Sequence, residues 1–412
     1  MKKVFLLLVA AACVAVSCKN EIKGEVLTPE ENKATLDETM TKAVQMLEVD
    51  NWQSTADLIT ASAVALEGIE GTDKSFEDWS QTMESAWNSE KDGIEIYTVD
   101  LEKVQGNLYV KDNKWYASEG KGLTITFPLE DGTEVKGTMT VKNSSAKVLV
   151  DENYSHWDAN GNWVDEEYLV GKEYVVVPAS IDAAVTAAGK SAATVKLTTD
   201  PHFAGEVPTL SDSFSATLAV TADKYSFAVT RAKYSPTEVA VDASIKYDKT
   251  TVVAASFEAK GKIGLDEDQD LDPLATTGKV NASFKVLDNV ELKGDFDYTA
   301  YIELSKKDHL DTEAGVKADC EALEKLANLT LYIQKTAQAK LGFEAIEKKP
   351  EGGESYWSVT PVIRFEDGSQ YMLPEEFFNP DNFPKTVEAI NAALAQMEEF
   401  LAGPESESEP LR

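Results

Sequence analysis

Alternating carboxylates between residues 266 and 272 are the clearest candidate for metal chemistry in this sequence. Four aspartates occupy every second position there: Asp266, Asp268, Asp270 and Asp272. Ca²⁺ prefers six to eight oxygen ligands, and such a run supplies several of them. An EF-hand loop beginning at Asp266 would need Gly at its sixth position and Glu at its twelfth, where this chain has Leu271 and Thr277. We therefore expect a solvated acidic loop, with weak calcium binding as the alternative.

The other chemical motifs are incomplete. Ala187–Ser191 reads AAGKS and ends like a phosphate-binding loop, but the required first glycine falls at Ala184. Val185 and Val195 flank this stretch at strand spacing, so we expect a hairpin turn at Gly189-Lys190. The three histidines lie in separate segments, at His156, His202 and His309. Neither an H-E-x-x-H nor a G-x-S-x-G motif occurs. With 72 acidic residues, a carboxylate pair for glycoside hydrolysis cannot be recognised from sequence. We expect no cofactor and lean against an enzyme.

A cluster of aromatic residues lies in the polar segment 151–172, at Trp157, Trp163 and Tyr168. Exposed aromatic rings can stack on sugars. Cross-strand aromatic packing within an irregular hairpin explains the same residues without any ligand. The sequence leaves both interpretations open.

The amino terminus has the pattern of a secretory signal peptide. Two lysines follow Met1, and Val4–Val16 is an uncharged apolar run of 13 residues. A bilayer-spanning helix needs roughly 20 such residues, so this run is too short to span. The run ends at Ala15–Cys18, which resembles a bacterial lipobox. The resemblance implies cleavage before Cys18, a diacylglycerol on its thiol and an acyl chain on the new amino terminus. Cys13, inside the apolar run, is the rival acylation site.

The lipobox resemblance implies a location as well as a modification. Two or more acyl chains hold a protein stably on a membrane. Lys19 follows Cys18 in place of the aspartate that retains many lipoproteins in the inner membrane, and Lys19–Glu21 is loosely similar to a surface-export tag. We expect a lipid-anchored protein of the outer membrane, on the cell surface or on the periplasmic face.

Charge and cysteine content exclude several classes of function. The formal net charge is −33, which repels nucleic acids and anionic headgroups, so we expect no nucleic-acid partner. Acylation of Cys18 would leave Cys320 as the one cysteine of the mature chain, so no internal disulfide is expected. The membrane, through the lipid, is the expected partner. A glycan, an apolar ligand or another protein remains open.

Five segments show the apolar spacing and capping residues of helices. They begin near Pro29, Gln53, Ser75, Asp311 and Pro384. Thr28-Pro29-Glu30-Glu31 combines an N-cap, a first-turn proline and a capping-box glutamate. The last helix, 384–402, carries a regular apolar stripe, which predicts docking on the apolar face of a sheet.

Most of the remaining chain alternates apolar and polar residues with the period of antiparallel strands. Residues 173–303 show it best, as in Val253, Ala255 and Phe257 between polar neighbours. Ala179–Ile181 matches Ala243–Ile245, and Ala216–Val220 is similar to Ala282–Val286. These spacings suggest a two-fold internal repeat, although alternating strands also resemble one another by chance.

These segments give a predicted organisation of the chain. It consists of a signal peptide (1–17), a tether (18–28), a helical segment (29–92), a small β region (93–172), an antiparallel β-meander (173–303), a region of helix, β-hairpins and C-terminal helix (304–402), and a disordered acidic tail (403–412). The predicted fold is α+β, a curved antiparallel meander with amphipathic helices packed on its apolar face.

The lipobox, the strand-rich middle and the hairpin at Phe365–Ser369 together resemble uncharacterised outer-membrane lipoproteins of the Bacteroidetes. This resemblance implies no activity and no site residues. We expect a non-catalytic binding or structural protein. The alternatives are a carrier with an apolar ligand in a sheet-lined cavity, and a glycan-binding or glycan-processing surface protein.

Overall fold

The computed structural model describes residues 25–48, 51, 53–153, 155–157, 163–165, 171–264, 271–307, 312–349, 354–372 and 380–402. The chain forms two compact units. The split unit contains residues 1–51 and 236–412, and the inserted unit contains residues 52–235. The predicted α+β class, with antiparallel sheet and packed helices, is confirmed. The predicted meander of residues 173–303 is shared between the two units.

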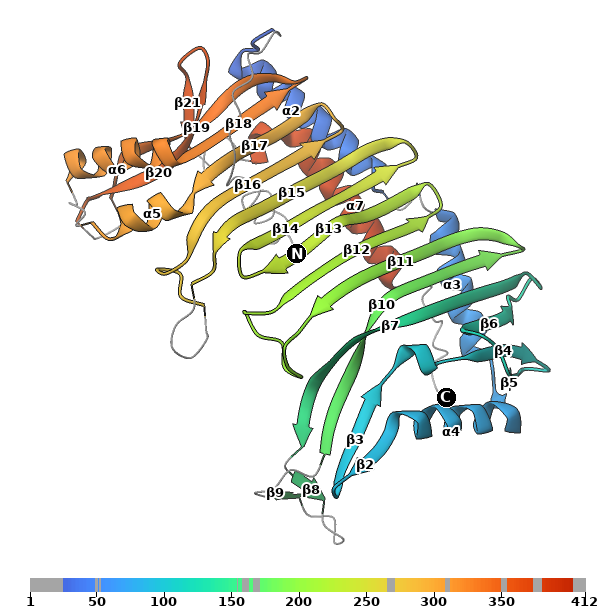
Figure 1. Cartoon of the computed structure of the whole chain (residues 1–412). Coiled ribbons are helices and arrows are strands. Elements are labelled where there is room, and N and C mark those ends of the chain that lie inside the picture. The colour runs from blue at the N-terminus through green and yellow to red at the C-terminus, as the bar shows by residue number, and fades with distance from the viewer. Residues whose placement is uncertain are drawn as a thin grey trace. The chain divides into compact units, whose positions relative to one another are not determined.

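The sheet of the split unit is an antiparallel meander in which each strand pairs with the next (Figure 1). Its strands are β14 (Glu238–Tyr247), β15 (Thr250–Lys262), β16 (Thr277–Val286), β17 (Val290–Asp297), β18 (Ala327–Ile333), β19 (Thr336–Lys348), β20 (Tyr356–Phe365) and β21 (Gln370–Met372). Val241 pairs with Phe257, which pairs with Ala282, so the predicted alternation does place apolar residues on one face.

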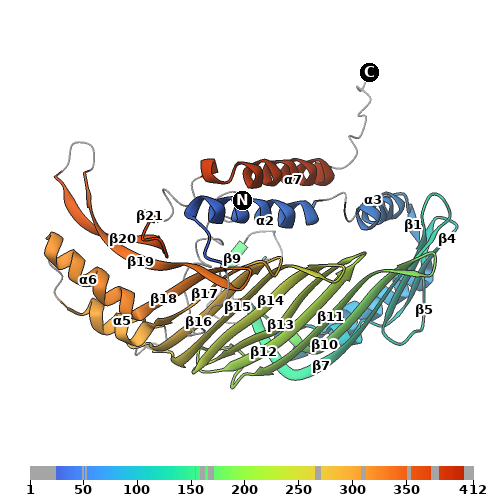
Figure 2. The same ribbon diagram turned by 90° about the horizontal axis from the view of Figure 1, so that it is seen from above.

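Helices cover both faces of the later strands of this sheet. α2 (Pro29–Met46) buries Leu36 and Ala43 in a core cluster with Val286, Ile333 and Phe365. α5 (Tyr298–Ser305) and α6 (Glu313–Leu326) lie on the opposite face, where α6 packs on β19 and β20 (Figure 2). Six of the seven residues of β18 are buried, because this strand lies between the two helical layers.

The C-terminal helix α7 (Pro384–Ala402) forms an outer layer on α2. Figure 2 shows α2 between α7 and the sheet. The prediction that this helix docks on the sheet itself was therefore wrong. Its buried residues Thr386 and Ala389 face another helix instead. An apolar stripe predicts that a helix packs, but it does not identify the element on which the helix packs.

The start of α2 follows the predicted capping box. The Thr28 hydroxyl accepts a hydrogen bond from Glu31 N at 3.3 Å, and the Glu31 carboxylate accepts one from Thr28 N at 2.9 Å. Pro29 occupies the first turn, where its missing N–H costs nothing. The hydrogen bond from the Thr28 backbone is the main reason why the pKa of Glu31 is lowered.

The start of α7 is held by a side chain from α2. Asp37 Oδ1 accepts hydrogen bonds from Thr386 N and Thr386 Oγ1, both at 2.8 Å, and Asp37 Oδ2 accepts one from Lys385 N at 3.4 Å. Asp37 and Thr386 are both buried. A carboxylate therefore satisfies free N–H groups at the positive end of a helix and joins two layers of the unit.

Two local predictions need correction. The apolar alternation of Tyr298 and Ile302 predicted a strand to residue 303, but α5 begins at Tyr298. Asp297 acts as its N-cap by accepting a hydrogen bond from Ala300 N at 3.0 Å. The hairpin turn predicted at Gly189-Lys190 lies one residue earlier, at Ala188-Gly189, because both have positive φ and β11 begins at Lys190.

The inserted unit is built around β10 (Gly171–Ala187), which pairs with three strands. They are β7 (Glu134–Asn153), β11 (Lys190–His202) and, through five residues in parallel, β3 (Ile94–Val99). Outer strands extend the sheet: β2 (Asn88–Lys91) on β3, β12 (Ser213–Ala222) and β13 (Tyr225–Ser235) beyond β11, and β6 (Leu123–Pro128), β4 (Gly106–Lys111), β5 (Lys114–Ser118) and β1 (Gly71–Thr72) beyond β7. β8 (Ser155–Trp157) and β9 (Trp163–Asp165) form a separate pair.

Helices cover the strands of the inserted unit unevenly. α4 (Lys74–Trp87) packs on β5, with the rings of Phe76 and Trp115 6.1 Å apart. α3 (Gln53–Glu67) buries Ala56. No residue of β12 or β13 is buried, so these two strands are accessible on both faces within their unit.

We expect Asp37→Ala to destabilise the split unit more than Glu38→Ala. The first change leaves buried N–H groups of α7 without an acceptor, which typically costs about 1–3 kcal/mol. Glu38 is exposed and pairs only with exposed Lys42, a contact worth roughly 0–1 kcal/mol. Chemical denaturation and amide exchange at Thr386 measure the difference. Equal stability of the two variants would show that Asp37 does not hold α7.

Candidate functional site

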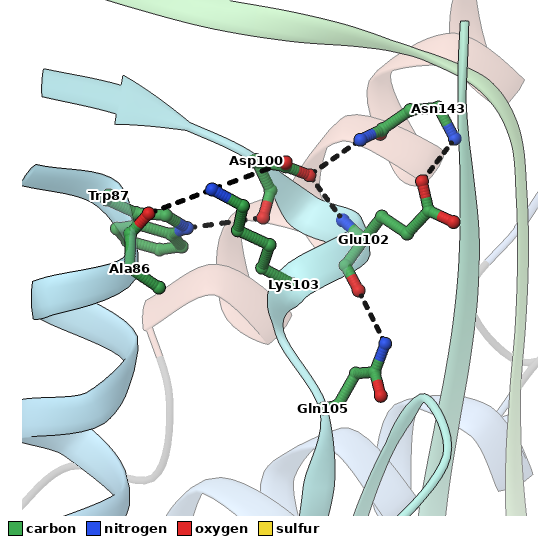
Figure 3. Close-up of polar contacts among 7 residues, drawn as sticks. All are labelled: Ala86, Trp87, Asp100, Glu102, Lys103, Gln105 and Asn143. Atoms are coloured by element: carbon green, nitrogen blue, oxygen red, sulfur yellow. Dashed lines mark hydrogen bonds and ion pairs between the residues drawn. The ribbon is translucent and has the colours of Figure 1, made fainter.

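A network of polar contacts surrounds Asp100 in the inserted unit (Figure 3). Asp100 follows β3 and caps a 3₁₀ turn, η2 (Leu101–Lys103), by accepting a hydrogen bond from Glu102 N at 3.1 Å. The same oxygen, Oδ1, accepts a second bond from Asn143 Nδ2 at 2.7 Å. A buried carboxylate is thereby stabilised by two N–H donors.

This network also connects α4 with β7. Trp87 Nε1 donates to the backbone oxygen of Asp100 at 3.2 Å, and Lys103 Nζ donates to Ala86 O at 2.9 Å. Glu102 Oε2 accepts a hydrogen bond from Asn143 N at 3.0 Å. Figure 3 shows these groups converging from the helix, the 3₁₀ turn and the long strand. The contacts fix where α4 ends against the sheet.

The chemistry open to this network is limited by its own bonds. Asp100 Oδ2 lies 3.9 Å from Lys103 Nζ, so its charge is already balanced. Asn143 Oδ1 is buried with no hydrogen-bond partner, at the irregular register between β7 and Pro178 of β10. Among the described residues, no group of three His, Cys, Asp or Glu side chains could hold a metal ion. We interpret the network as structural.

A second network lies under α6 in the split unit. The Arg364 guanidinium donates to Glu324 and, at 2.7 Å, to Glu344 Oε1. Glu324 Oε1 also accepts a hydrogen bond from Phe343 N at 3.0 Å. Arg364 therefore joins α6 to two strands, β19 and β20.

Cys320 lies on the inner face of α6 and is buried. Burial is the main cause that raises the pKa of its thiol, and the nearby Glu344 and Glu324 carboxylates raise it further. A thiol that is buried and kept protonated is a poor nucleophile.

The attachment of the amino-terminal segment is the third polar site. Gln338, at the start of β19 and fully buried, accepts a hydrogen bond from Leu27 N at 2.8 Å and donates one to Glu25 O at 3.1 Å. Asn32, also fully buried, donates from Nδ2 to Leu27 O at 3.1 Å and to Thr28 O at 3.0 Å. Two side-chain amides thus hold the chain that leads into α2, in the way that a neighbouring strand would.

Part of the apolar sheet face of the split unit remains exposed. Val241 and Phe257, which pair across β14 and β15, are 41% and 38% exposed. A pocket of about 210 Å³ lies at the ends of β14–β16 and beside Tyr298. Gly261 and Gly278 pair within it, where a Cβ on Gly261 would approach Thr277 O to 1.9 Å. This volume is below the roughly 300–1,000 Å³ of typical ligand sites.

Several of the residues singled out in the sequence lie outside the part of the chain that the structure describes. These are Cys18, Asp266, Asp268, Asp270, Tyr168 and His309. Asp272 is described, and its Oδ1 accepts a hydrogen bond from Leu274 N at 2.9 Å, so this carboxylate stabilises a turn. The calcium prediction therefore stays a prediction.

The remaining candidates are not assembled into a site. The backbones of Trp157 and Trp163 pair across β8 and β9, which places both at the same level of one hairpin. His202 Nε2 lies 3.2 Å from Asp200 Oδ2, but the two side chains are 67% and 71% exposed. Water screens such an exposed pair, and the structure gives it no buried nucleophile.

Asp37 and Gln338 were not identified from the sequence, and their hydrogen bonds join residues far apart in it. Their partners lie 349 and 311 residues away. Gln338 sits in the stretch Thr336–Lys340, T-A-Q-A-K, where no local pattern distinguishes a buried glutamine from an exposed one.

No protein-family model, no curated protein and no solved structure matches this chain. None of the described helices is long and apolar enough to cross a membrane.

We expect Arg364→Leu to destabilise the protein because it leaves Glu324 and Glu344 without their shared cation. Hydrogen bonds to charged groups contribute about 1.5–3 kcal/mol each, less where water reaches the pair, as it does here. Lys317→Leu is the matched control, since Lys317 pairs on the same helix with exposed Glu313. Thermal denaturation compares the two, and equal melting temperatures would contradict a structural role for Arg364.

Proposed function

We propose that this chain is an exported, non-catalytic lipoprotein that is acylated at Cys18 and holds a binding surface close to the outer membrane. The lipobox-like Ala15–Cys18 supplies the anchor in this proposal. The observation that carries it is the attachment of Glu25 and Leu27 to buried Gln338. An anchor transmits position to a folded body only if the chain after it is fixed to that body.

The length between the anchor and the fold supports this coupling. Glu25 follows Cys18 by seven residues. A fully extended chain spans at most ~3.6 Å per residue, so the proposed lipid lies no more than about 25 Å from Glu25, where Gln338 holds the chain. The tether enters the split unit, whose α2 is buried between the sheet and α7. The folded protein would therefore stay within a short distance of the lipid surface.

A second candidate function, carriage of an apolar ligand, is favoured by the exposed Val241 and Phe257 and by the adjoining pocket. We rank it second because the pocket is small and opens at strand ends. Saturable binding of an apolar dye that is lost in Phe257→Asp would favour the carrier over the scaffold.

We expect Cys18→Ala to abolish labelling by a radioactive or alkyne-tagged fatty acid and to release the chain from the membrane fraction. Cys13→Ala is the matched control and should leave both properties unchanged, because Cys13 lies inside the apolar run. If Cys18→Ala still takes up label while Cys13→Ala does not, the assigned acylation site is wrong.

We expect Gln338→Leu to loosen the amino-terminal segment without removing the anchor. The change keeps the apolar volume but leaves Leu27 N and Glu25 O without their partners. Hydrogen exchange at the Leu27 amide should become at least about tenfold faster, the ratio that corresponds to 1.4 kcal/mol. Gln45→Leu, on the exposed side of α2, is the control. An unchanged exchange rate at the Leu27 amide would show that Gln338 does not fix the amino-terminal segment.

A further inference from the structure

Figure 1 shows the β4–β5 hairpin of the inserted unit. A pair of stacked tyrosines, Tyr109 and Tyr116, lies on this hairpin. Tyr109 and Tyr116 face each other across the two strands, with ring centroids 5.5 Å apart and planes inclined by 14°. Tyr109 is 37% exposed. In the described part of the chain, neither phenolic hydroxyl has a hydrogen-bond partner. The pair therefore offers nearly parallel aromatic rings and two free hydroxyls to a ligand.

The stacking pair faces outward because the other side of the hairpin is already covered. Leu108 and Ala117 are buried on that side. The ring of Trp115 packs against Phe76 of α4, and Ala117 N donates to Ser75 Oγ at 3.2 Å. Successive strand residues point to opposite faces, so Tyr109 and Tyr116 lie on the face away from α4.

Lysines extend the tyrosine pair on the same face. Lys111 pairs directly with Lys114 across the hairpin, one step beyond the tyrosines. Like charges directly opposite each other destabilise a hairpin. Tyr109 pairs with Thr126 of β6, which pairs with Lys136 of β7, so all three lie side by side across the strands. Lys136 is also exposed. No ion pair is described for any of the three lysines. We call Tyr109, Tyr116, Lys111, Lys114 and Lys136 the aromatic–lysine patch.

The charge of this region differs from that of the whole chain. Residues 106–136, which contain the whole patch, carry four lysines and five carboxylates, so this stretch is nearly neutral in a protein with a formal net charge of −33. The acidic residues nearest in sequence to the patch are Asp112, in the turn, and Glu134, two residues before Lys136. The Lys114 charge also contributes to lowering the pKa of Asp73, for which the hydrogen bond from Ser75 N is the largest cause. The patch places three exposed lysines with no described ion pair in a nearly neutral stretch of an acidic chain, and such lysines can pair with the anionic groups of a ligand.

We propose that the aromatic–lysine patch binds an acidic carbohydrate, that is, a sugar chain whose rings carry carboxylate or sulfate groups. The tyrosine rings would stack on the apolar C–H face of a sugar ring, and the lysines would pair with its anionic groups. The hydroxyls of Tyr109, Tyr116 and Thr126 would bond to sugar hydroxyls. This inference rests on the proposed function of a binding protein and names its class of ligand.

Single-stranded nucleic acid is the competing polyanion, because it too binds aromatic rings and lysines. Two observations favour the sugar. The net charge of −33 opposes a long polyanion, whereas an acidic oligosaccharide needs only a few cationic partners. The signal-peptide pattern at Met1–Cys18 also directs the chain out of the cytoplasm.

The test uses the full chain and trigalacturonate as the probe, with its methyl ester as the matched neutral sugar and oligothymidylate as the nucleic acid. Calorimetric titration measures the dissociation constants. We expect trigalacturonate to bind about tenfold or more tightly than its ester, a difference of 1.4 kcal/mol or more. Added salt should reduce this preference, because surface charges are screened.

Variants assign the binding to the patch. Tyr109→Ala should weaken binding by about fivefold or more, within the range for loss of one aromatic stack. The double variant Lys111→Gln/Lys114→Gln should weaken binding of the acid because it removes two positive charges. Tyr356→Ala and Lys190→Gln alter an exposed tyrosine and an exposed lysine elsewhere and should change nothing. Circular dichroism checks that the hairpin variants fold. The lysine variant, which relieves a like-charge pair, should be no less stable than the parent.

Several results would overturn the proposal. Equal affinity for the acid and its ester, or binding that survives both patch variants, would exclude the assigned chemistry. Tighter binding of oligothymidylate would assign the patch to nucleic acid. If the sugar titration fails but Cys18→Ala abolishes fatty-acid labelling, the ligand class is wrong and the lipid anchor stands. If Cys18→Ala keeps its label, the proposed anchor is wrong.

Discussion

The burial of α2 between a sheet and a second helix is the interaction on which the split unit depends. Leu36 and Ala43 complete the apolar core over the later strands, and Asp37, one residue after Leu36, caps α7. Buried apolar area supplies most of the favourable free energy, roughly 25 cal/mol per Å², but it is not directional. The relative orientation of the packed elements is set by hydrogen bonds of Asp37 and of the Asn32 and Gln338 side-chain amides. A buried polar group without its partner costs free energy, so other orientations are disfavoured. One amino-terminal helix thus sets the positions of the tether, the sheet and α7.

Each of the two units leaves one kind of surface accessible. In the split unit, Val241 and Phe257 continue the apolar face that α2 covers farther along the strands. In the inserted unit, the outward side of the β4–β5 hairpin carries tyrosines and lysines, while its inward side packs on α4. An antiparallel sheet permits this division because its residues alternate between faces, so one strand can serve a core and a binding surface at once.

How much the sequence predicts depends on whether the deciding contact is local. The capping box at Thr28 and Glu31 and the alternation from Val253 to Phe257 are local, and the structure agrees with both. Tyr298 and Ile302 fit both a strand and a helix pattern, and the single cap at Asp297 decided for the helix. The roles of Asp37, Gln338 and Arg364 come from partners distant in sequence or from packing that no local pattern encodes.

The closure of α2 on α7 has a consequence for the order in which the chain folds. Their bond joins residues 349 positions apart, and loop-closure entropy and contact order both make so distant a pairing slow. Synthesis delivers the amino terminus first, as would the proposed export, so α2 must wait until β15–β20 and Pro384 have emerged. The inserted unit, whose strands all lie between residues 52 and 235, can pair its sheet in the meantime. If Cys18 is acylated early, the waiting helix is held at the membrane, where its exposed Leu36 face needs protection from aggregation by a chaperone or by the bilayer surface.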